Sequence, residues 1–128
     1  SRFFPFLPAL IDNRDYSFTL LSLEEIKHLK EYFQNKNALF TDFPDYFSKE
    51  EIKRQADPRL QPYLFHKKRI PFAQYCDSCY LMLDFIPGDL GQQGQILCYV
   101  HDPDEVLYVC SDITSLIDDI RENIITTS

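Results

Sequence analysis

The sequence has no tryptophan, only three glycines and four cysteines in 128 residues, and 13 basic side chains against 20 acidic ones. Four cysteines without the spacing of a disulfide framework favour reduced thiols in a cytoplasmic protein. A net charge of −7 argues against direct nucleic-acid binding, because a phosphate backbone is neutralised by clustered lysine and arginine. The tight basic run at residues 67–69 is expected to form a solvated strand edge. The charge instead favours a basic partner.

Long apolar runs are missing as well. The longest, residues 3–11, is interrupted by Pro5 and Pro8 and falls far short of the roughly 20 residues that span a bilayer. The start lacks the charged region, apolar region and cleavage site of a signal peptide, and Ser1 stands in place of an initiating methionine. We therefore expect no membrane partner and a cytoplasmic location, with some N-terminal sequence missing.

Apolar residues make up 45% of the chain, enough for one domain to bury a core. Two capping boxes predict helix starts, one formed by Ser22 and Glu25 and the other by Ser48 and Glu51. The second helix is mostly polar and should end before residues 57–58, because a residue that precedes proline disfavours the helical region. The first helix carries an apolar stripe of Leu23, Ile26, Leu29, Lys30 and Phe33.

Short runs rich in aromatic and β-branched residues follow, at 63–65, 70–73, 80–85, 95–100 and 106–110. The links between the last three are too short for crossover helices, so these strands should form an antiparallel meander. A final helix is predicted after Asp112, with an apolar face of Ile113, Leu116, Ile117, Ile120 and Ile124. The predicted fold class is α+β, a single domain with a central, mostly antiparallel sheet flanked by helices.

Gly88, Gly91 and Gly94 all fall in one loop between two predicted strands. Glycine enters positive φ without steric cost, so this loop should concentrate the backbone freedom of the chain. A phosphate-binding loop would need a following lysine and serine or threonine, or a helix N-terminus, whereas a strand follows here. We therefore expect a turn-rich connection and no phosphate site.

The cysteines are candidate metal ligands. Cys76 and Cys79 have the spacing of a zinc knuckle, but Cys98 and Cys110 lie in separate predicted strands with no second close pair. Buried core cysteines are the better interpretation.

The carboxylates Asp84, Asp102, Asp104 and Glu105 could be drawn as a nuclease pair, and His101 stands beside Asp102. No motif places a general base among them, so solvated surface is the better interpretation. The sequence predicts no enzyme, no metal and no cofactor.

An ordered set of motifs resembles the SUKH superfamily, in particular its Smi/Knr group. The set comprises residues 80–88, then 94–96 and 101–102, then Val109 leading into the helix at Asp112. Upstream, residues 20–26 and 70–73 look like the leucine-serine-leucine-glutamate helix start and the isoleucine-proline strand of that family. Arg69 replaces the tryptophan often found before this strand, and the usual N-terminal helix is not visible.

The resemblance implies a compact α+β domain without catalytic chemistry. Bacterial members are most often immunity proteins, which bind and inactivate a polymorphic toxin made beside them, and many of these toxins are nucleases. Eukaryotic members act as intracellular scaffolds or regulators, so a noncatalytic adaptor is the alternative. We expect residues 1–128 to form one SUKH-like domain that lacks part of the N-terminal helix region.

The function predicted from this resemblance and from the acid excess is neutralisation of a cognate, basic toxin domain by direct occlusion. An aromatic anchor surrounded by acidic groups would suit a basic cleft. The predicted toxin-binding rim is Tyr75, Asp77, Asp89, Asp102, Asp104 and Glu105.

Overall fold

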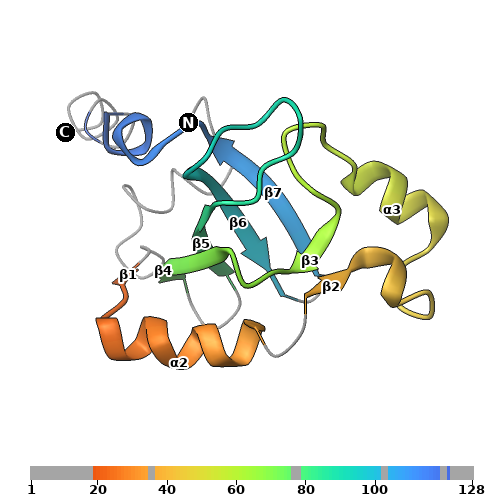
Figure 1. The fold of residues 1–128 in the computed structure, drawn as a ribbon, viewed down its shortest axis with the longest axis horizontal. Coiled ribbons are helices and arrows are strands. Elements are labelled where there is room, and N and C mark those ends of the chain that lie inside the picture. The colour runs from red at the N-terminus through yellow and green to blue at the C-terminus, as the bar shows by residue number, and fades with distance from the viewer. Residues whose placement is uncertain (1–18, 35–36, 76–78, 102–103, 119–120, 122–128) are drawn as a thin grey trace.

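The computed structural model describes residues 19–34, 37–75, 79–101, 104–118 and 121. Its centre is a five-stranded antiparallel sheet in the order β1-β4-β5-β6-β7 (Figure 1). These strands are β1 (Thr19–Leu20), β4 (Arg69–Tyr75), β5 (Cys79–Asp84), β6 (Gln95–Val100) and β7 (Glu105–Cys110). A second sheet pairs β2 (Ala38–Leu39) with β3 (Tyr63–Phe65). The α+β class and the antiparallel meander predicted from the sequence are confirmed.

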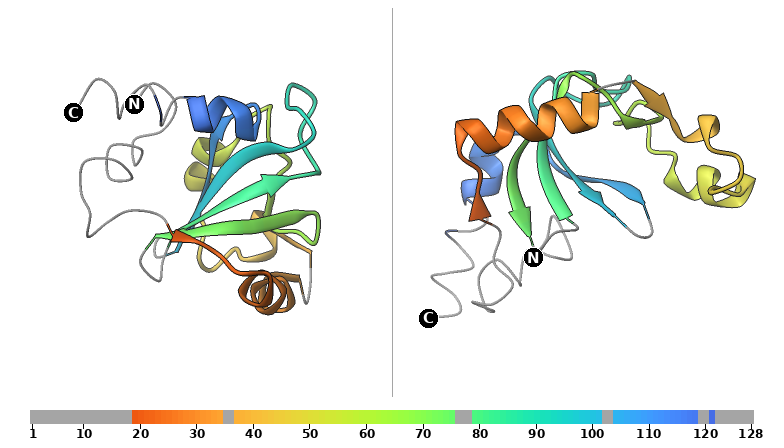
Figure 2. Two further views of the ribbon diagram at one scale, coloured as in Figure 1. Left: turned by 90° about the vertical axis from the view of Figure 1, so that its left-hand side faces the viewer. Right: turned by 90° about the horizontal axis from the view of Figure 1, so that it is seen from below.

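The 12-residue α2 (Leu23–Gln34) contacts β4, whereas the 7-residue α3 (Lys49–Gln55) contacts β7 (Figures 1 and 2). The helices α2 and α3 therefore lie toward opposite edges of the sheet, and Leu29 of α2 and Ile52 of α3 pack against the same face. A 3₁₀ turn, η2 (Phe40–Asp42), precedes α3, and a further helical segment follows β7 at residues 113–118. Within the described ranges, no helix is long and apolar enough to cross a membrane.

Both predicted capping boxes are confirmed. The Glu25 amide donates to Ser22 Oγ at 3.1 Å, and the Ser22 amide donates to Glu25 Oε1 at 3.1 Å. The same exchange joins Ser48 and Glu51 at 3.1 and 3.3 Å. Each box satisfies two backbone donors that a helix start would otherwise leave without partners. The apolar stripe of α2 is only partly buried, because Leu23 is 85% exposed at the first helical position.

One face of the sheet is aliphatic and rich in cysteine. Its buried residues are Ala73, Cys79, Leu81, Ile96, Cys98, Val109, Cys110 and Leu116. Cys98 and Cys110 are therefore core residues, as predicted, and a hydrogen bond with Cys79 together with burial raises the pKa of the Cys98 thiol. Cys76 lies outside the described residues.

The segment 113–118 starts as predicted, with Asp112 Oδ1 accepting from the Ser115 amide at 2.7 Å. Leu116 packs into the aliphatic face, but Ile113 and Ile117 are 40% and 56% exposed. The prediction of one continuous buried stripe is wrong for these two isoleucines, because the helix lies beyond the end of β7 instead of along the sheet (Figure 1). The predicted positions Ile120 and Ile124 lie outside the described residues.

The opposite face of the sheet is aromatic. Its buried residues are Phe40, Leu60, Leu64, Met82, Leu97, Tyr99 and Val106, with Phe43, Phe47, Phe65, Tyr80 and Tyr108 packed partly buried against them. The segment from β2 through α3 to β3 contributes most of the covering side chains of this face, and Leu29 of α2 also packs against it. Strands β5 and β6 are therefore apolar on both faces, which explains their near-continuous apolar runs.

The three glycines of the glycine loop are required for two different reasons. Gly94 has a φ of +79°, which glycine adopts without strain. A Cβ at Gly88 would lie 2.5 Å from the Pro58 carbonyl oxygen, and one at Gly91 would lie 2.3 Å from that of Arg59. The expectation of backbone freedom is therefore right for Gly94, while the other two glycines let the loop pack directly on the neighbouring backbone.

Candidate functional site

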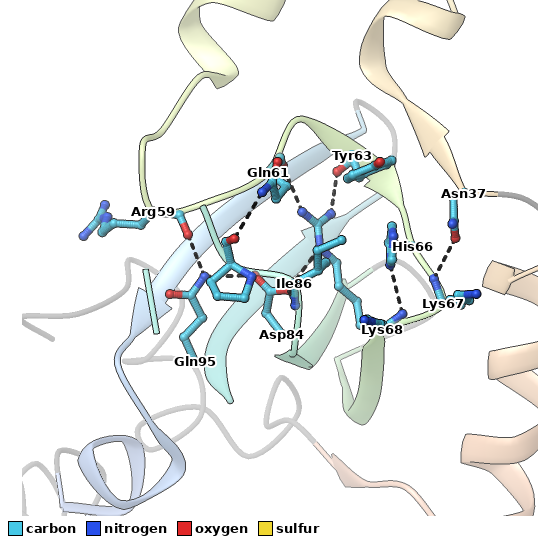
Figure 3. Close-up of polar contacts among 12 residues, drawn as sticks. Asn37, Arg59, Gln61, Tyr63, His66, Lys67, Lys68, Asp84, Ile86 and Gln95 are labelled. Atoms are coloured by element: carbon cyan, nitrogen blue, oxygen red, sulfur yellow. Dashed lines mark hydrogen bonds and ion pairs between the residues drawn. The ribbon is translucent and has the colours of Figure 1, made fainter. Parts of the chain in front are cut away.

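Three polar side chains form a buried cluster at one end of the sheet: Arg69, Asp84 and Gln95, which are 2%, 0% and 0% exposed. Figure 3 labels Asp84 and Gln95 of this cluster. They stand opposite one another on adjacent strands, since Arg69 pairs with Asp84 and Asp84 with Gln95. The register of β4, β5 and β6 therefore places one cation, one anion and one amide side by side. We call these three residues the buried polar cluster.

Arg69 is held by carbonyls and a carboxylate. Its Nη2 donates to the Gln61 carbonyl at 2.9 Å and its Nη1 donates to the Tyr63 carbonyl, while its Nε lies 3.6 Å from Asp84 Oδ1. Burial lowers the pKa of the Arg69 guanidinium, and the charge of Asp84 opposes this change. The guanidinium thus binds the segment that leads into β3 to the end of the sheet.

Gln95 connects the same cluster to the glycine loop. Its Nε2 donates to Asp84 Oδ2 at 2.9 Å and to the Arg59 carbonyl at 2.8 Å, and its Oε1 accepts from the Gln92 amide at 3.0 Å. Asp84 Oδ1 also accepts from the Ile86 amide at 3.0 Å. These contacts fix the loop against the chain around Arg59.

The expectation of a solvated edge at residues 67–69 is wrong for Arg69, and the expectation of a solvated carboxylate is wrong for Asp84. Lys67 and Lys68 are exposed, as expected. Strand alternation turns Arg69 inward, and paired hydrogen bonds then allow its charge to be buried. The sequence gives little indication that Arg69 and Asp84 are buried, because a polar residue at a strand end is usually solvated.

His66 lies beside this cluster and is 5% exposed. Its Nδ1 accepts from the Lys68 amide at 3.1 Å, and its ring meets the Tyr63 ring edge-on at 4.6 Å between centroids. Burial, followed by the positive charges of Arg69 and the two lysines, lowers the pKa of His66. The ring is therefore held in its neutral form as a hydrogen-bond acceptor.

Two hollows lie along the edge strand β7 and toward the opposite end of the sheet. A groove of about 440 Å³ runs between α3 and β7 and is lined by Phe40, Phe47, Glu51, Arg54, Gln55, Ala56, Asp57 and residues 104–108; we call it the α3 groove. Beside it lies an aromatic pocket of about 550 Å³, lined by Phe43, Tyr46, Phe47, Glu51, Leu64, Phe65, His101 and Asp104. Glu51, Phe47 and Asp104 line both hollows, so the two form one continuous surface.

Carboxylates dominate the charge of this surface. Glu51 and Glu105 are exposed, and Asp104 is half-buried with its Oδ1 2.8 Å from His101 Nδ1. Asp57 is bound by Arg59 at 2.7 Å, and this hydrogen bond holds the pKa of the Asp57 carboxyl below its ordinary value.

Apolar contact area accompanies these charges. Tyr46 is 79% exposed at the mouth of the aromatic pocket, and Phe47 packs edge-on against Phe40 at 5.0 Å between centroids. The Arg59 guanidinium lies 3.6 Å from the centroid of the Tyr108 ring. Aromatic rings beside carboxylates are the groups that recognise lysine and arginine side chains.

The structure separates the residues of the predicted rim. Asp104 and Glu105 lie together at the α3 groove. Register places Tyr75 at the same end of the sheet, through the pairs Tyr75–Cys79, Cys79–Val100 and Val100–Glu105. Asp89 is exposed in the glycine loop, at the opposite end. The positions of Asp77 and Asp102 lie outside the described residues, as does the side chain of Tyr75.

The sequence pattern does not indicate that Tyr46, Glu51 and Gln55 contribute to this surface. The helix that carries Glu51 and Gln55 was expected to be polar, and nothing in its pattern indicated that it would stand over β7. The signal that could have pointed to it is the aromatic run before its cap, where Phe43, Tyr46 and Phe47 occur within five residues.

These observations define a class of protein: a small α+β domain whose hollows, within the described residues, combine aromatic rings with carboxylates as protein-binding surfaces do. In the same described residues, no group of three or more His, Cys, Asp or Glu side chains is placed to hold a metal ion.

The SMI1/KNR4 family model (SUKH-1) matches residues 3–119, and the chain belongs to this family. The resemblance recognised in the sequence is thereby confirmed. No curated protein matches the chain.

Proposed function

We propose that this protein is an immunity protein that binds a cognate toxin domain and neutralises it by occlusion. Members of its family are generally noncatalytic and are associated with binding a partner protein. The observation that carries the proposal is the surface formed by the α3 groove and the aromatic pocket, where Glu51, Asp104 and Glu105 surround Tyr46 and Phe47.

The charge of this surface suits a basic target. A toxin that acts on nucleic acid has a basic substrate cleft, and exposed carboxylates steer such a cleft into contact and then oppose its charge. The net charge of −7 adds a long-range attraction. The aromatic side chains supply the apolar contact area that holds the complex once it has formed.

The proposed interface keeps most of the rim predicted from the sequence. Asp104 and Glu105 belong to it, and Tyr75, Asp77 and Asp102 remain predicted members. Asp89 does not share this surface, because the glycine loop is at the other end of the sheet.

A tagged pull-down from the source organism, eluted in high salt and identified by mass spectrometry, tests the proposal. We expect a basic toxin domain whose activity falls when this protein is added. Recovery of an assembly without toxic activity would contradict immunity and support the noncatalytic adaptor.

A charge-reversal variant then tests the surface. Replacing Asp102, Asp104 and Glu105 with lysine should slow association and reduce its salt dependence. A matched variant replaces Glu24, Glu31 and Asp89 with lysine, which changes the net charge equally at exposed positions elsewhere. Equal loss of association rate in both variants would show that only net charge matters and that this surface is not the interface.

A further inference from the structure

Strand β7 ends the order of the described sheet, and its outer side faces α3 (Figure 1). The side chain of Gln55 in α3 contacts the backbone of Val106 in this strand. The Val106 amide donates to Gln55 Oε1 at 3.1 Å, and Gln55 Nε2 donates to the Val106 carbonyl oxygen. The Gln55 side chain therefore binds both backbone groups of one residue in the edge strand.

A carboxamide carries the same donor and acceptor as a peptide group. Gln55 thus makes the pair of hydrogen bonds that a neighbouring antiparallel strand would make to Val106. Two residues further along the strand, Tyr108 has the same orientation, because Val106 and Tyr108 face Tyr99 and Leu97 without a register shift between them. Among the described residues, no side chain forms hydrogen bonds with both the amide and the carbonyl of Tyr108, as Gln55 does with those of Val106.

Apart from this contact, α3 is held by Ile52, which packs partly buried against the aromatic face of the sheet. The helix has seven residues, none of them buried. Hollows lie on both sides of the Gln55–Val106 contact: the α3 groove on one side, and on the other a cavity of about 440 Å³ whose lining includes Thr41, Ile52 and Pro62. The Gln55–Val106 contact therefore lies between two hollows, from which an incoming chain could reach the outer edge of β7.

We propose that Gln55 is a removable latch on the edge of β7, and that the partner inserts an extended segment that pairs with β7 in its place. The partner backbone would take over the hydrogen bonds of Val106 and continue to Tyr108, while its basic side chains face Glu51 and Glu105. This inference rests on the proposed function and specifies how the same surface binds. A second copy of this chain is the wrong occupant, because each copy carries a net charge of −7.

Hydrogen exchange tests the latch in the free protein. In Gln55→Met, which keeps the side-chain length but removes both hydrogen bonds, the Val106 amide should exchange about tenfold faster than in the wild type. The Leu107 amide faces β6 and should keep its rate. The matched control is Gln92→Met, the same substitution at an exposed position in the glycine loop. Equal exchange at Val106 in all three proteins would overturn the latch.

A synthetic strand tests the occupant. The probe is a fluorescent hexapeptide of alternating lysine and valine, compared with the same peptide N-methylated at every second residue. We expect the unmodified peptide to bind Gln55→Met about tenfold more tightly than the wild type and to protect the Tyr108 amide from exchange. Binding by the N-methylated peptide, or no binding to Gln55→Met, would overturn strand addition.

The two proposals fail in different ways. If a captured toxin is neutralised and the charge-reversal variant loses it, but Tyr108 gains no protection in the complex, strand addition is wrong and the immunity function stands. If the peptide pairs with β7 while the pull-down yields a nontoxic assembly, the latch stands and immunity is wrong.

Discussion

Carboxylates occupy both ends of the central sheet, but they are buried at one end and exposed at the other. Asp84 is completely buried and meets Arg69 and Gln95, whereas Glu105 is exposed beside the α3 groove. A buried carboxylate needs partners for its charge, and these partners hold the neighbouring segments in place. An exposed carboxylate has little effect on stability and is available to a partner. The comparison separates residues that maintain the fold from residues that can bind.

The largest effect is expected when the buried end loses its cation. Arg69→Met should lower the free energy of unfolding by about 3–5 kcal/mol, because it leaves the charge of Asp84 buried without a counterion. Urea denaturation followed by circular dichroism measures this loss.

The double variant Arg69→Met with Asp84→Leu distinguishes a lost ion pair from lost packing. Removing both charges should recover much of the stability, since buried ion pairs are often replaceable by apolar side chains. A double variant no more stable than Arg69→Met would show that lost hydrogen bonds and packing, and not the unpaired charge, cause the loss.

A smaller effect is expected from the amide in the same cluster. Gln95→Leu should cost about 1–3 kcal/mol, because Asp84 Oδ2 and the Arg59 carbonyl each lose a hydrogen bond in a buried site. The measurement is again denaturant unfolding, with Gln92→Leu as an exposed control that should remain near wild type. Equal losses of stability in the two variants would show that the buried amide of Gln95 contributes no more than the exposed amide of Gln92.

His66 should make stability depend on pH near the buried end. Its pKa is lowered in the folded protein from the ordinary value of 6.5, so the unfolded chain binds the proton more readily. Its stabilising contribution is therefore fully present above pH 6.5 and declines as the pH falls toward the lower folded pKa. Unfolding experiments between pH 8 and pH 5 should show this decline in the wild type.

A matched variant assigns the pH effect. His66→Asn keeps an acceptor for the Lys68 amide but does not titrate, so the decline in stability just below pH 6.5 should become shallower. An unchanged slope in His66→Asn would assign the effect to other groups.

The smallest effect on stability is expected at the end with exposed carboxylates. Glu105→Gln should change the free energy of unfolding by no more than about 0.5 kcal/mol, because the side chain is exposed. The same variant should slow association with a basic partner, measured by stopped-flow mixing at low salt. A large loss of stability would mean that Glu105 maintains the fold and would weaken the contrast between the two ends.

Local sequence patterns predicted much of the fold. The strands at 63–65 and 95–100 match β3 and β6, and the other three predicted runs differ from the structure by one or two residues at their ends. Capping boxes and alternation involve residues close together in the chain, so their physics is visible in the sequence. The strands β1 and β2 were missed, because two residues are too few to show a pattern.

The candidate site was less predictable. The sequence-based prediction placed Asp104 and Glu105 in one rim with Asp89, whereas the chain carries Asp89 to the opposite end of the sheet from Asp104. It also treated Asp84 and Arg69 as surface residues. These errors share a cause, since burial and proximity depend on which strands become neighbours and in what register.

By itself, the sequence determined the family, the α+β class, the helix starts and the antiparallel meander, because these depend on composition, order and short-range spacing. Only the tertiary structure decided which carboxylates are buried and which face solvent. It also placed Gln55 on Val106, 51 residues away along the chain. Such contacts form only when the sheet order and the placement of α3 are set, and no local pattern encodes the distance between them.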